Sequence, residues 1–403
     1  TSKDLFRYFI ENKLLKSLFD FENNEKIFDI HRSFKFCLLT LSKKASFKTI
    51  DLLFFATNPN HVYEEHRHYS LSTDEFLLIN PNTSNCPVFR NKYDASIILK
   101  IYKQADVIHN ELTGINEYGW NAWQMVNDTH EKKILEPFQQ NNINLYGAYE
   151  GKLFFQYDHR YSNYIRKEFL SNTNYSSEFI SSKRYSISKS IIDHKIEKNG
   201  WKQKWQLTFR LVCRATDNRT FISSIIPRSG TMVSAPTVVI DDYKKSLFLL
   251  SNLNCFAFDY VVRTKIGGTA LNHFIVKQLP IVPLNKFTKK ISDTINEIVL
   301  KLSYTCVDLK TFAYDFGFEG DPFIWNEKER FQLQCELDAI YAHLYGLEKE
   351  EMDYILETFP IVKRKDIAKY GSYRTKETIL QLYDEFAWVR QEMAKTSYKL
   401  GEV

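Results

Sequence analysis

The sequence predicts an α+β protein built from three successive regions, and three observations support this fold class. Near the N-terminus, short apolar runs stand between polar turns, which is typical of strands covered on both faces. In residues 147–283, short runs of β-branched and aromatic residues alternate with turn residues and indicate mainly β structure. From residue 284 to residue 403, apolar positions recur every three or four residues and indicate helices.

The first region, residues 1–146, is expected to contain a helix, three strands and an irregular connector. Apolar residues at helical spacing, beginning with Leu5 and Phe9, predict the helix. The three strands are predicted at LLKSLFDFEN (14–23), FKFCLLTLSK (34–43) and TIDLLFFAT (49–57). Because the chain opens on this pattern without an initiator methionine or a leader, we expect it to be a piece of a longer protein.

The middle region ends in RTKIGGTALNHFIVKQLPIVPLNKF, which predicts a joint between domains. Gly267 and Gly268 favour a sharp turn or a close approach of another backbone or a phosphate. Phe274 to Val276 is predicted as a short strand, and Pro280 and Pro283 prevent its continuation. Before this segment, residues 246–262 are expected to form a helix.

The third region, residues 284–403, is expected to be helical throughout. One predicted helix starts at Asn326, which stands at capping-box spacing from Glu329, and ends at Gly346. The helix predicted before it has its apolar positions at Phe287, Ile291, Ile295, Ile298 and Leu302.

Length and composition limit the classes of protein to consider. A chain of 403 residues with 44% hydrophobic and 15% aromatic residues is expected to fold throughout, into two or three domains. The six cysteines contain no C-x-x-C pair, which argues against a zinc ribbon or a disulfide framework and favours a reducing cytoplasm. The most apolar run, residues 247–262, is interrupted by polar side chains, so no membrane segment is predicted.

Positive charge is concentrated in the middle of the chain. The formal net charge is only +5, yet residues 150–250 hold 17 Lys and Arg against 9 Asp and Glu. Such a region is suited to face phosphates, and a merely solvated basic face is the alternative. The segments GKLFFQYDHRYSNYIRK and KNGWKQKWQLTFRLVCR also interleave these cations with aromatic residues, which either pack on nucleic acid or fill a β core.

We therefore predict contacts with double-stranded DNA from cations of the middle region. Lys and Arg neutralise phosphates, and Arg can also pair with base edges. The predicted contacts are Lys152, Arg160, Lys183, Arg184, Lys202, Lys204, Arg210, Arg214 and Arg228. The residues predicted to clamp the DNA backbone are Lys265, Gly267, Gly268 and Thr269.

No catalytic residue, metal site or cofactor site is predicted in this chain. The loop HVYEEHRH offers five possible metal ligands, His61, Glu64, Glu65, His66 and His68. Consecutive loop residues rarely converge on one ion, so a solvated loop is expected. The segment TNPNH departs from the Asn-Pro-Pro-aromatic motif of amino-methyltransferases at Asn60 and His61, and no Gly-rich turn follows a first strand to hold S-adenosylmethionine.

Six segments carry a resemblance that spans nearly the whole chain. They are FENNEKIFDIHRSFKFCLLTL, LLINPNTSNCPVFR, YEGKLFFQYDHRY, LNCFAFDYVVRTKIGGTALNHFIVKQLPIVP, ERFQLQCELDAIYAHLYGL and YILETFPIVKRKDIAKYGSYRTKETIL. In this order they are similar to landmarks of large adenine-specific DNA methyltransferases. Those enzymes belong to restriction-modification and related phage-defence systems, and some are fused to an endonuclease.

The resemblance implies a role for each region. Residues 1–146 would be the last part of the methyltransferase sheet plus a connector, residues 147–283 the target-recognition domain, and residues 284–403 a helical spacer. The catalytic motifs would lie upstream of Thr1, in a methyltransferase domain that would bind S-adenosylmethionine, flip an adenine and methylate it. The partners implied for this chain are double-stranded DNA and that upstream domain.

Two alternatives come from other functional classes. The chain could be an adaptor whose C-terminal helices bind a partner subunit while its basic face is incidental. It could also be a metal-dependent nuclease that uses the His-rich loop, residues 61–68.

Overall fold

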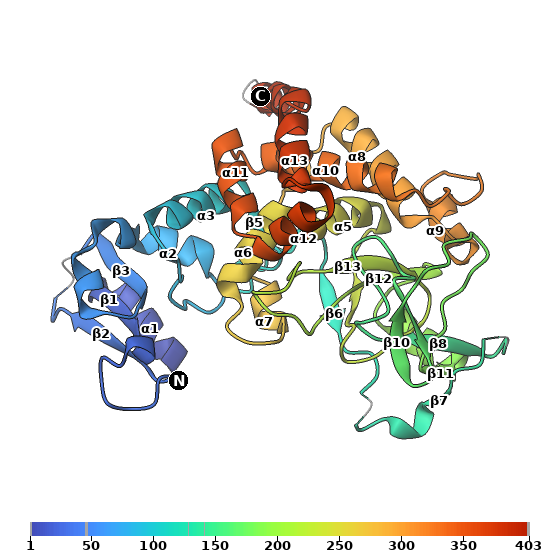
Figure 1. The fold of residues 1–403 in the computed structure, drawn as a ribbon, viewed down its shortest axis with the longest axis horizontal. Coiled ribbons are helices and arrows are strands. Elements are labelled where there is room, and N and C mark those ends of the chain that lie inside the picture. Colours follow the sequence, from blue (N-terminus) through green and yellow to red (C-terminus); the bar gives the residue numbers. More distant parts are fainter. Residues whose placement is uncertain (1, 45–46, 128, 141, 401–403) are drawn as a thin grey trace.

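The computed structural model describes residues 2–44, 47–127, 129–140 and 142–400. It shows an α+β fold, as the sequence predicts. In Figure 1 the N-terminal sheet lies at one end, the β-rich lobe at the other, and helices of the middle and C-terminal regions connect them. Within the described ranges, no helix has both the length and the apolar character needed to cross a membrane.

The N-terminal unit is a four-stranded sheet with flanking helices. Its elements are α1 (Ser2–Glu11), β1 (Leu15–Glu22), β2 (Lys35–Leu41), β3 (Thr49–Ala56), β4 (Tyr69–Ser72), α2 (Thr73–Ile79) and α3 (Lys92–Gln104). The strand order is β2-β1-β3-β4, with β1 and β3 parallel and the other pairs antiparallel. The predicted helix and all three predicted strands are therefore confirmed.

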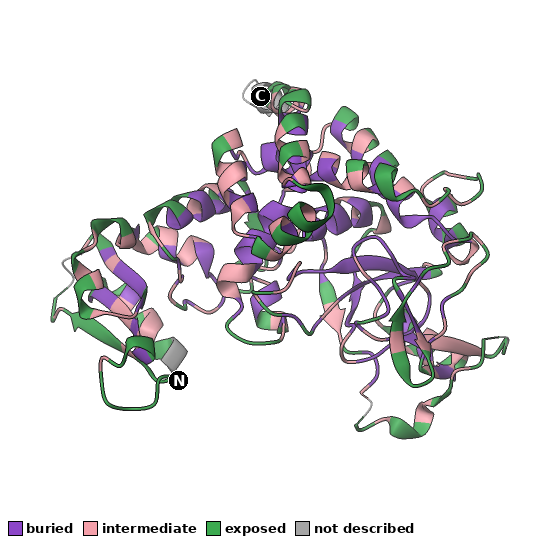
Figure 2. Cartoon of the chain, in the orientation of Figure 1, coloured by how far each residue is buried: buried purple, intermediate pink, exposed green. Residues whose placement is uncertain are grey.

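Strand β2 forms an open edge of this sheet and is mostly exposed (Figure 2). Three of its leucines, Leu38, Leu39 and Leu41, are 54, 42 and 43% exposed. An apolar edge strand of this kind is a ready template for pairing with another chain or domain.

The β lobe contains two four-stranded sheets, a separate hairpin and one helix. Its elements are β6 (Asn121–Trp123), β7 (Glu136–Pro137), β8 (Leu145–Tyr149), β9 (Ser162–Ile165), β10 (Glu168–Ser171), β11 (Tyr185–Ser188), α4 (Lys189–Lys198), β12 (Trp205–Phe209), β13 (Ser223–Pro227), β14 (Gly230–Thr231) and β15 (Thr237–Val239). The sheet orders are β14-β8-β11-β7 and β13-β12-β15-β6. Since β6 and β7 pair within these sheets, part of the expected connector contributes to the lobe.

A short stem closes the β lobe where the chain leaves and re-enters it. Strands β5 (Asp106–Val107) and β16 (Pro280–Ile281) pair antiparallel. Just before β16, the predicted strand at Phe274 is wrong, because residues His273–Val276 form a helical turn, α7. The amides of Ile275 and Val276 donate to the carbonyl of Asn272, and Phe274 is exposed, so no sheet partner holds this segment extended.

The helix predicted at residues 246–262 is present but interrupted. It consists of α5 (Ser246–Asn254) and α6 (Phe256–Lys265), and Cys255 between them has extended backbone angles. Both helices are almost entirely buried, and they contact helices of the C-terminal region. They therefore provide the platform on which the C-terminal helices pack.

The C-terminal region is helical, as predicted. Its helices are α8 (Lys289–Ser303), α9 (Lys310–Asp315), α10 (Glu327–Leu344), α11 (Lys349–Glu357), α12 (Pro360–Tyr370), α13 (Arg374–Glu385) and α14 (Trp388–Leu400). Asn326 caps α10 by accepting from the amides of Lys328 and Glu329, and Gly346 follows its end at φ +69°. One buried apolar cluster extends from Ile10 to Val389 and so connects all three regions.

A tight loop of the β lobe, residues 156–160, joins the lobe to the helical region. Arg160 is fully buried, and its guanidinium donates to the carbonyl oxygens of Ser176, Phe179 and Thr305 at 2.7, 3.1 and 2.9 Å. A buried guanidinium needs acceptors for its N–H groups, and these three carbonyls supply them for the two terminal nitrogens of Arg160. Because Thr305 follows α8, the bonds hold the loop against the helical region.

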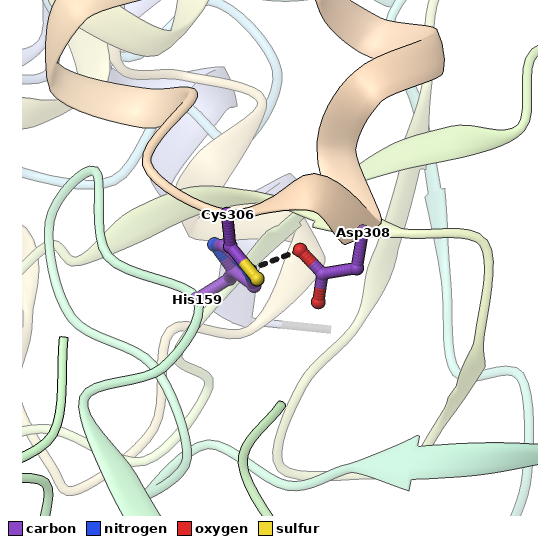
Figure 3. Close-up of side chains that lie close together, drawn as sticks. All are labelled: His159, Cys306 and Asp308. Carbon is purple, nitrogen blue, oxygen red and sulfur yellow. Dashed lines mark hydrogen bonds and ion pairs between the residues drawn. The ribbon is translucent and has the colours of Figure 1, made fainter. Parts of the chain in front are cut away.

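His159 makes the second contact between the loop and the helical region. Its Nε2 atom lies 2.9 Å from Oδ1 of Asp308, in the 3-10 turn Val307–Leu309 (Figure 3). Burial raises the pKa of Asp308, but the charge and hydrogen bond of His159, with Lys183 nearby, outweigh burial and bring the pKa to about 2. Cys306, the third member of this group, is buried, and burial raises its pKa to about 12.

Arg330 of α10 makes a third contact, which reaches from the helical region to the loop of the β lobe. Its guanidinium donates to the carbonyl oxygens of Leu302 and Tyr157 at 2.5 and 3.3 Å and stacks on the Trp325 ring at 3.7 Å. Burial lowers the pKa of Arg330 to about 10. Helix α10, the end of α8 and the loop are thus held together by side chains reaching in both directions.

Replacing Asp308 by Asn is expected to lower the free energy of unfolding by about 2 kcal/mol at pH 7, because one pKa unit corresponds to about 1.4 kcal/mol. The folded-state pKa lies below the ordinary value of 3.8, so the stabilisation is complete above pH 4 and disappears as the pH falls through 2. Denaturant unfolding of both proteins at several pH values from 7 down to about 2 measures this difference.

The matched control is Asp321→Asn, at an exposed carboxylate of the same region. A stability loss for Asp308→Asn no larger than that of the control at pH 7 would contradict the assigned role of the ion pair.

Candidate nucleic-acid interface

Three of the predicted DNA contacts are buried. Arg160 is fully enclosed by the carbonyls described above. Arg228 is 4% exposed, and its guanidinium lies 2.6 Å from Asp193 and 2.9 Å from Glu197, both on α4. Their guanidinium groups are held inside the lobe, so in this structure neither Arg160 nor Arg228 presents its charge to an outside molecule as predicted, and both residues stabilise the lobe.

Lys183 is the third buried cation. Its Nζ atom donates to the carbonyl and hydroxyl oxygens of Ser181 at 2.6 and 2.8 Å and lies 4.5 Å from the centre of the Tyr149 ring. Burial lowers its pKa to about 8. The side chain packs beside Asp308 in the lobe, so in this structure Lys183 does not present its charge to an outside molecule as predicted either.

Arg210 and Lys265 are partly buried and already bound within the protein. The Arg210 guanidinium donates to the carbonyls of Gly151 and Phe154 at 2.7 and 2.6 Å. The Lys265 ammonium donates to the carbonyl of Ile79 and to Oδ1 of Asn80, both at 2.6 Å, and burial lowers its pKa well below the usual value. Lys265 therefore connects α6 to the N-terminal unit, in the place where the sequence predicts a joint.

The two glycines beside Lys265 do not use the backbone angles that only glycine adopts readily. Neither Gly267 nor Gly268 is among the residues with positive φ, and an added Cβ would meet no atom within 4 Å at either position. Both are exposed, as is Thr269, whose carbonyl accepts from the amide of Cys213. Folding thus does not require glycine there, while the open surface leaves room for another molecule to approach the backbone.

The remaining five predicted contacts are exposed, at three places on the β lobe. Lys202 and Lys204 lie in the turn between α4 and β12, and Arg214 lies in the loop after β12. Lys152 and Arg184 flank the hairpin of β9 and β10, where they meet two further cations.

The β9–β10 hairpin has an unusual turn. Ile165 pairs with Glu168 and Tyr164 with Phe169, so Arg166 and Lys167 are the two turn residues. Their φ angles are +49° and +66°, the left-handed conformation that two-residue hairpins require and that Asn-Gly usually supplies. For residues with a Cβ this conformation costs about 1–2 kcal/mol each. The protein therefore holds two exposed cations at the tip of a strained turn.

Lys152 and Arg184 lie over the aromatic pair of the same hairpin. The rings of Tyr164 and Phe169 are 5.0 Å apart. Lys152 Nζ lies 5.5 Å from the Phe169 ring, and the Arg184 guanidinium lies 5.8 Å from the Tyr164 ring. We call Lys152, Arg166, Lys167 and Arg184 the hairpin patch.

Two carboxylates accompany the hairpin patch. Glu150 lies 3.8 Å from Arg184, and Glu168 follows the turn in β10. The patch nevertheless keeps an excess of positive charge on a projecting two-stranded ribbon. Arg166 and Lys167 were not predicted as turn residues, although the segment SNYIRKEFLS has the form of two four-residue strands around a charged pair.

A large cleft of about 810 Å³ separates the N-terminal sheet from α6 and the start of α12. It is lined by Phe55, Arg90, Tyr260, Arg263 and Gly267, among other residues. Phe55 has a φ of +58° and is 39% exposed, which is a strained conformation for a bulky side chain. The cleft thus combines aromatic and cationic side chains next to the exposed glycines.

The His-rich loop does not gather metal ligands among the described residues. His68 faces Asp51 at 3.0 Å through Nδ1, and its Nε2 faces the carbonyl of Val62 at 2.9 Å, so both ring nitrogens are engaged. The described group of potential ligands is instead His159, Cys306 and Asp308. There the ion pair and the adjacent ammonium of Lys183 already balance the carboxylate, so we interpret the group as a structural contact.

Comparisons with known proteins find structural likenesses but no matching sequence family. No protein-family model matches the chain, and no curated protein matches it. A solved structure described as the type IIG restriction endonuclease BpuSI is similar to it, with a TM-score of 0.32 and 10% sequence identity. The similarity covers 89% of this chain and 45% of that one, so the chain spans less than half the length of that structure.

Replacing Arg166 by Asn together with Lys167 by Gly is expected to raise the free energy of unfolding by about 1 kcal/mol, because these residues adopt the left-handed turn with less strain. Thermal and denaturant unfolding measure the change. The matched control, Arg166→Gln with Lys167→Gln, removes the same charges but keeps side chains with ordinary backbone preferences. Equal stability of the Asn-Gly variant and the control would show that the turn is not strained.

Proposed function

We propose that the β lobe binds double-stranded DNA through the hairpin patch, as the recognition part of an adenine-specific DNA methyltransferase. The observation that carries this proposal is the strained hairpin tip with its two exposed cations. A turn made of Arg166 and Lys167 sacrifices stability that Asn-Gly would retain, and such strain is characteristic of functional sites.

The shape of the hairpin suits duplex DNA. A two-stranded antiparallel ribbon fits the major groove, where arginine can pair with guanine and lysine can reach phosphates. Arg166 and Lys167 project at the tip, while Lys152 and Arg184 flank the strands and are placed to meet the DNA backbone. Recognition of one particular sequence would then depend on the tip, and affinity on the flanking cations.

The N-terminal unit supports the second part of the proposal. The edge strand β2 exposes Leu38, Leu39 and Leu41, and an upstream methyltransferase domain would cover them by continuing the sheet. In this proposal that domain supplies the catalytic residues and binds S-adenosylmethionine. The described residues of this chain would supply the recognition lobe and the helices that hold it.

Binding to a pool of randomised duplexes at two salt concentrations tests the proposal. The expected result is enrichment of one short motif, with affinity that falls steeply as salt rises. Each phosphate neutralised contributes about 0.9 to the slope of log K against log salt, so the four cations of the hairpin patch would contribute between about 3 and 4.

The double variant Arg166→Gln with Lys167→Gln should lose the enriched motif and reduce the salt slope by up to about 2. The control, Lys43→Gln with Lys44→Gln, removes an exposed pair from the N-terminal unit and should bind as the unaltered chain does. If the hairpin variant and the control bind DNA equally well, the hairpin is not the DNA contact. If the unaltered chain binds no duplex, the adaptor alternative is favoured.

A further inference from the structure

Helix α12 (Pro360–Tyr370) is the most basic exposed helix surface outside the β lobe. Arg364, Lys365 and Lys369 are all exposed, whereas the helix buries only Val362. Its single carboxylate, Asp366, accepts a hydrogen bond from the amide of Thr375 at 2.6 Å, at the start of the next helix. The outer face of α12 therefore carries positive charge that the helix itself does not neutralise.

The cations around α12 differ in their pairing. Lys363 lies 2.7 Å from Glu357, and Lys376 lies 2.7 Å from both Asp353 and Glu357. Among the described residues, no carboxylate oxygen lies within 4.0 Å of Arg364 or Lys365. Lys363 and Lys376 are thus neutralised by ion pairs within the protein. Arg364 and Lys365 remain available to bind a ligand.

Each end of α12 lines a hollow in the protein surface, a groove beside the β lobe at one end and the 810 Å³ cleft at the other. At its C-terminal end, Lys369 and Tyr370 line a groove of about 630 Å³ together with Phe155 and Tyr161 of the β lobe. Tyr161 immediately precedes β9, so this groove reaches the base of the hairpin. The C-terminal end of α12 therefore shares a groove with the segment that leads into the hairpin.

The N-terminal end of α12 borders the other hollow. Pro360 and Ile361 line the 810 Å³ cleft, together with Arg263 and the exposed Arg90. Exposed positive charge is thus found at the hairpin, at α12 and, through Arg90, at the cleft, whose lining also includes the carboxylate of Asp20. Exposed cations at several places on a surface suit the phosphate backbone of a long polyanion.

We propose that α12 binds the phosphate backbone of the duplex whose bases meet the hairpin, with Arg364 and Lys365 as the principal contacts. This inference rests on the proposed function and changes the role of the helical region. The helices do more than space the β lobe from a neighbour, because one of them forms part of the DNA-binding surface. The contact is independent of sequence, since α12 lies away from the hairpin tip and its cations are suited to phosphates.

The test compares three double variants of the full chain on a duplex of about 30 base pairs, three helical turns. They are Arg364→Gln with Lys365→Gln on α12, Arg166→Gln with Lys167→Gln on the hairpin, and Lys43→Gln with Lys44→Gln as the control. All of these residues are exposed, so unfolding measurements should show equal stabilities. Affinity is measured at several salt concentrations, and the preferred motif is determined for each variant.

The α12 variant should bind all sequences more weakly, reduce the salt slope by about 2 and keep the enriched motif unchanged. If it matches the control while the hairpin variant binds more weakly, this inference is overturned and the proposed function stands. If no variant and no unaltered chain binds duplex DNA, both fail together. A changed motif in the α12 variant would also contradict the inference, because phosphate contacts carry no sequence preference.

Discussion

The relative position of the β lobe and the helical region depends on the buried guanidinium of Arg160. It sits in a loop of the lobe, yet it donates to the carbonyl of Thr305, just after α8, and His159 beside it faces Asp308 in the same segment. Arg330 reaches back from α10 to the carbonyl of Tyr157. These contacts are buried and charged, so they tolerate little displacement. They hold the loop that precedes the β9–β10 hairpin against the end of α8 and against α10, and so fix the hairpin relative to the helical region.

The fold was predictable wherever local pattern and burial agree. The apolar runs of the N-terminal strands and the helical period after residue 284 both predict their elements correctly, and Asn326 and Gly346 mark the ends of α10. The segment around Phe274 failed because its apolar residues do not all face a core: Phe274 is exposed while Val276 is buried. The edge strands β6 and β7 were missed because each is very short and is defined by partners far away in the sequence.

The candidate site was only partly predictable, because the sequence does not distinguish an Arg or Lys exposed to solvent from one buried among hydrogen-bond acceptors. Arg160 and Arg228 are embedded among carbonyls and carboxylates, which only the tertiary structure reveals. Lys152 and Arg184 were predicted, and the structure adds Arg166 and Lys167 between them. That pair is easily missed because Arg and Lys stand where a turn usually has Asn and Gly, and this departure is what suggests a function.

The measurement that tests the central claim most directly is amide hydrogen exchange of the full chain with and without duplex DNA. The account predicts that DNA slows exchange in the segment 162–171, most strongly at the amides of Arg166 and Lys167, whose turn projects into solvent in the free protein. DNA that binds without any change in exchange at the hairpin, while another part of the chain becomes protected, would contradict the account.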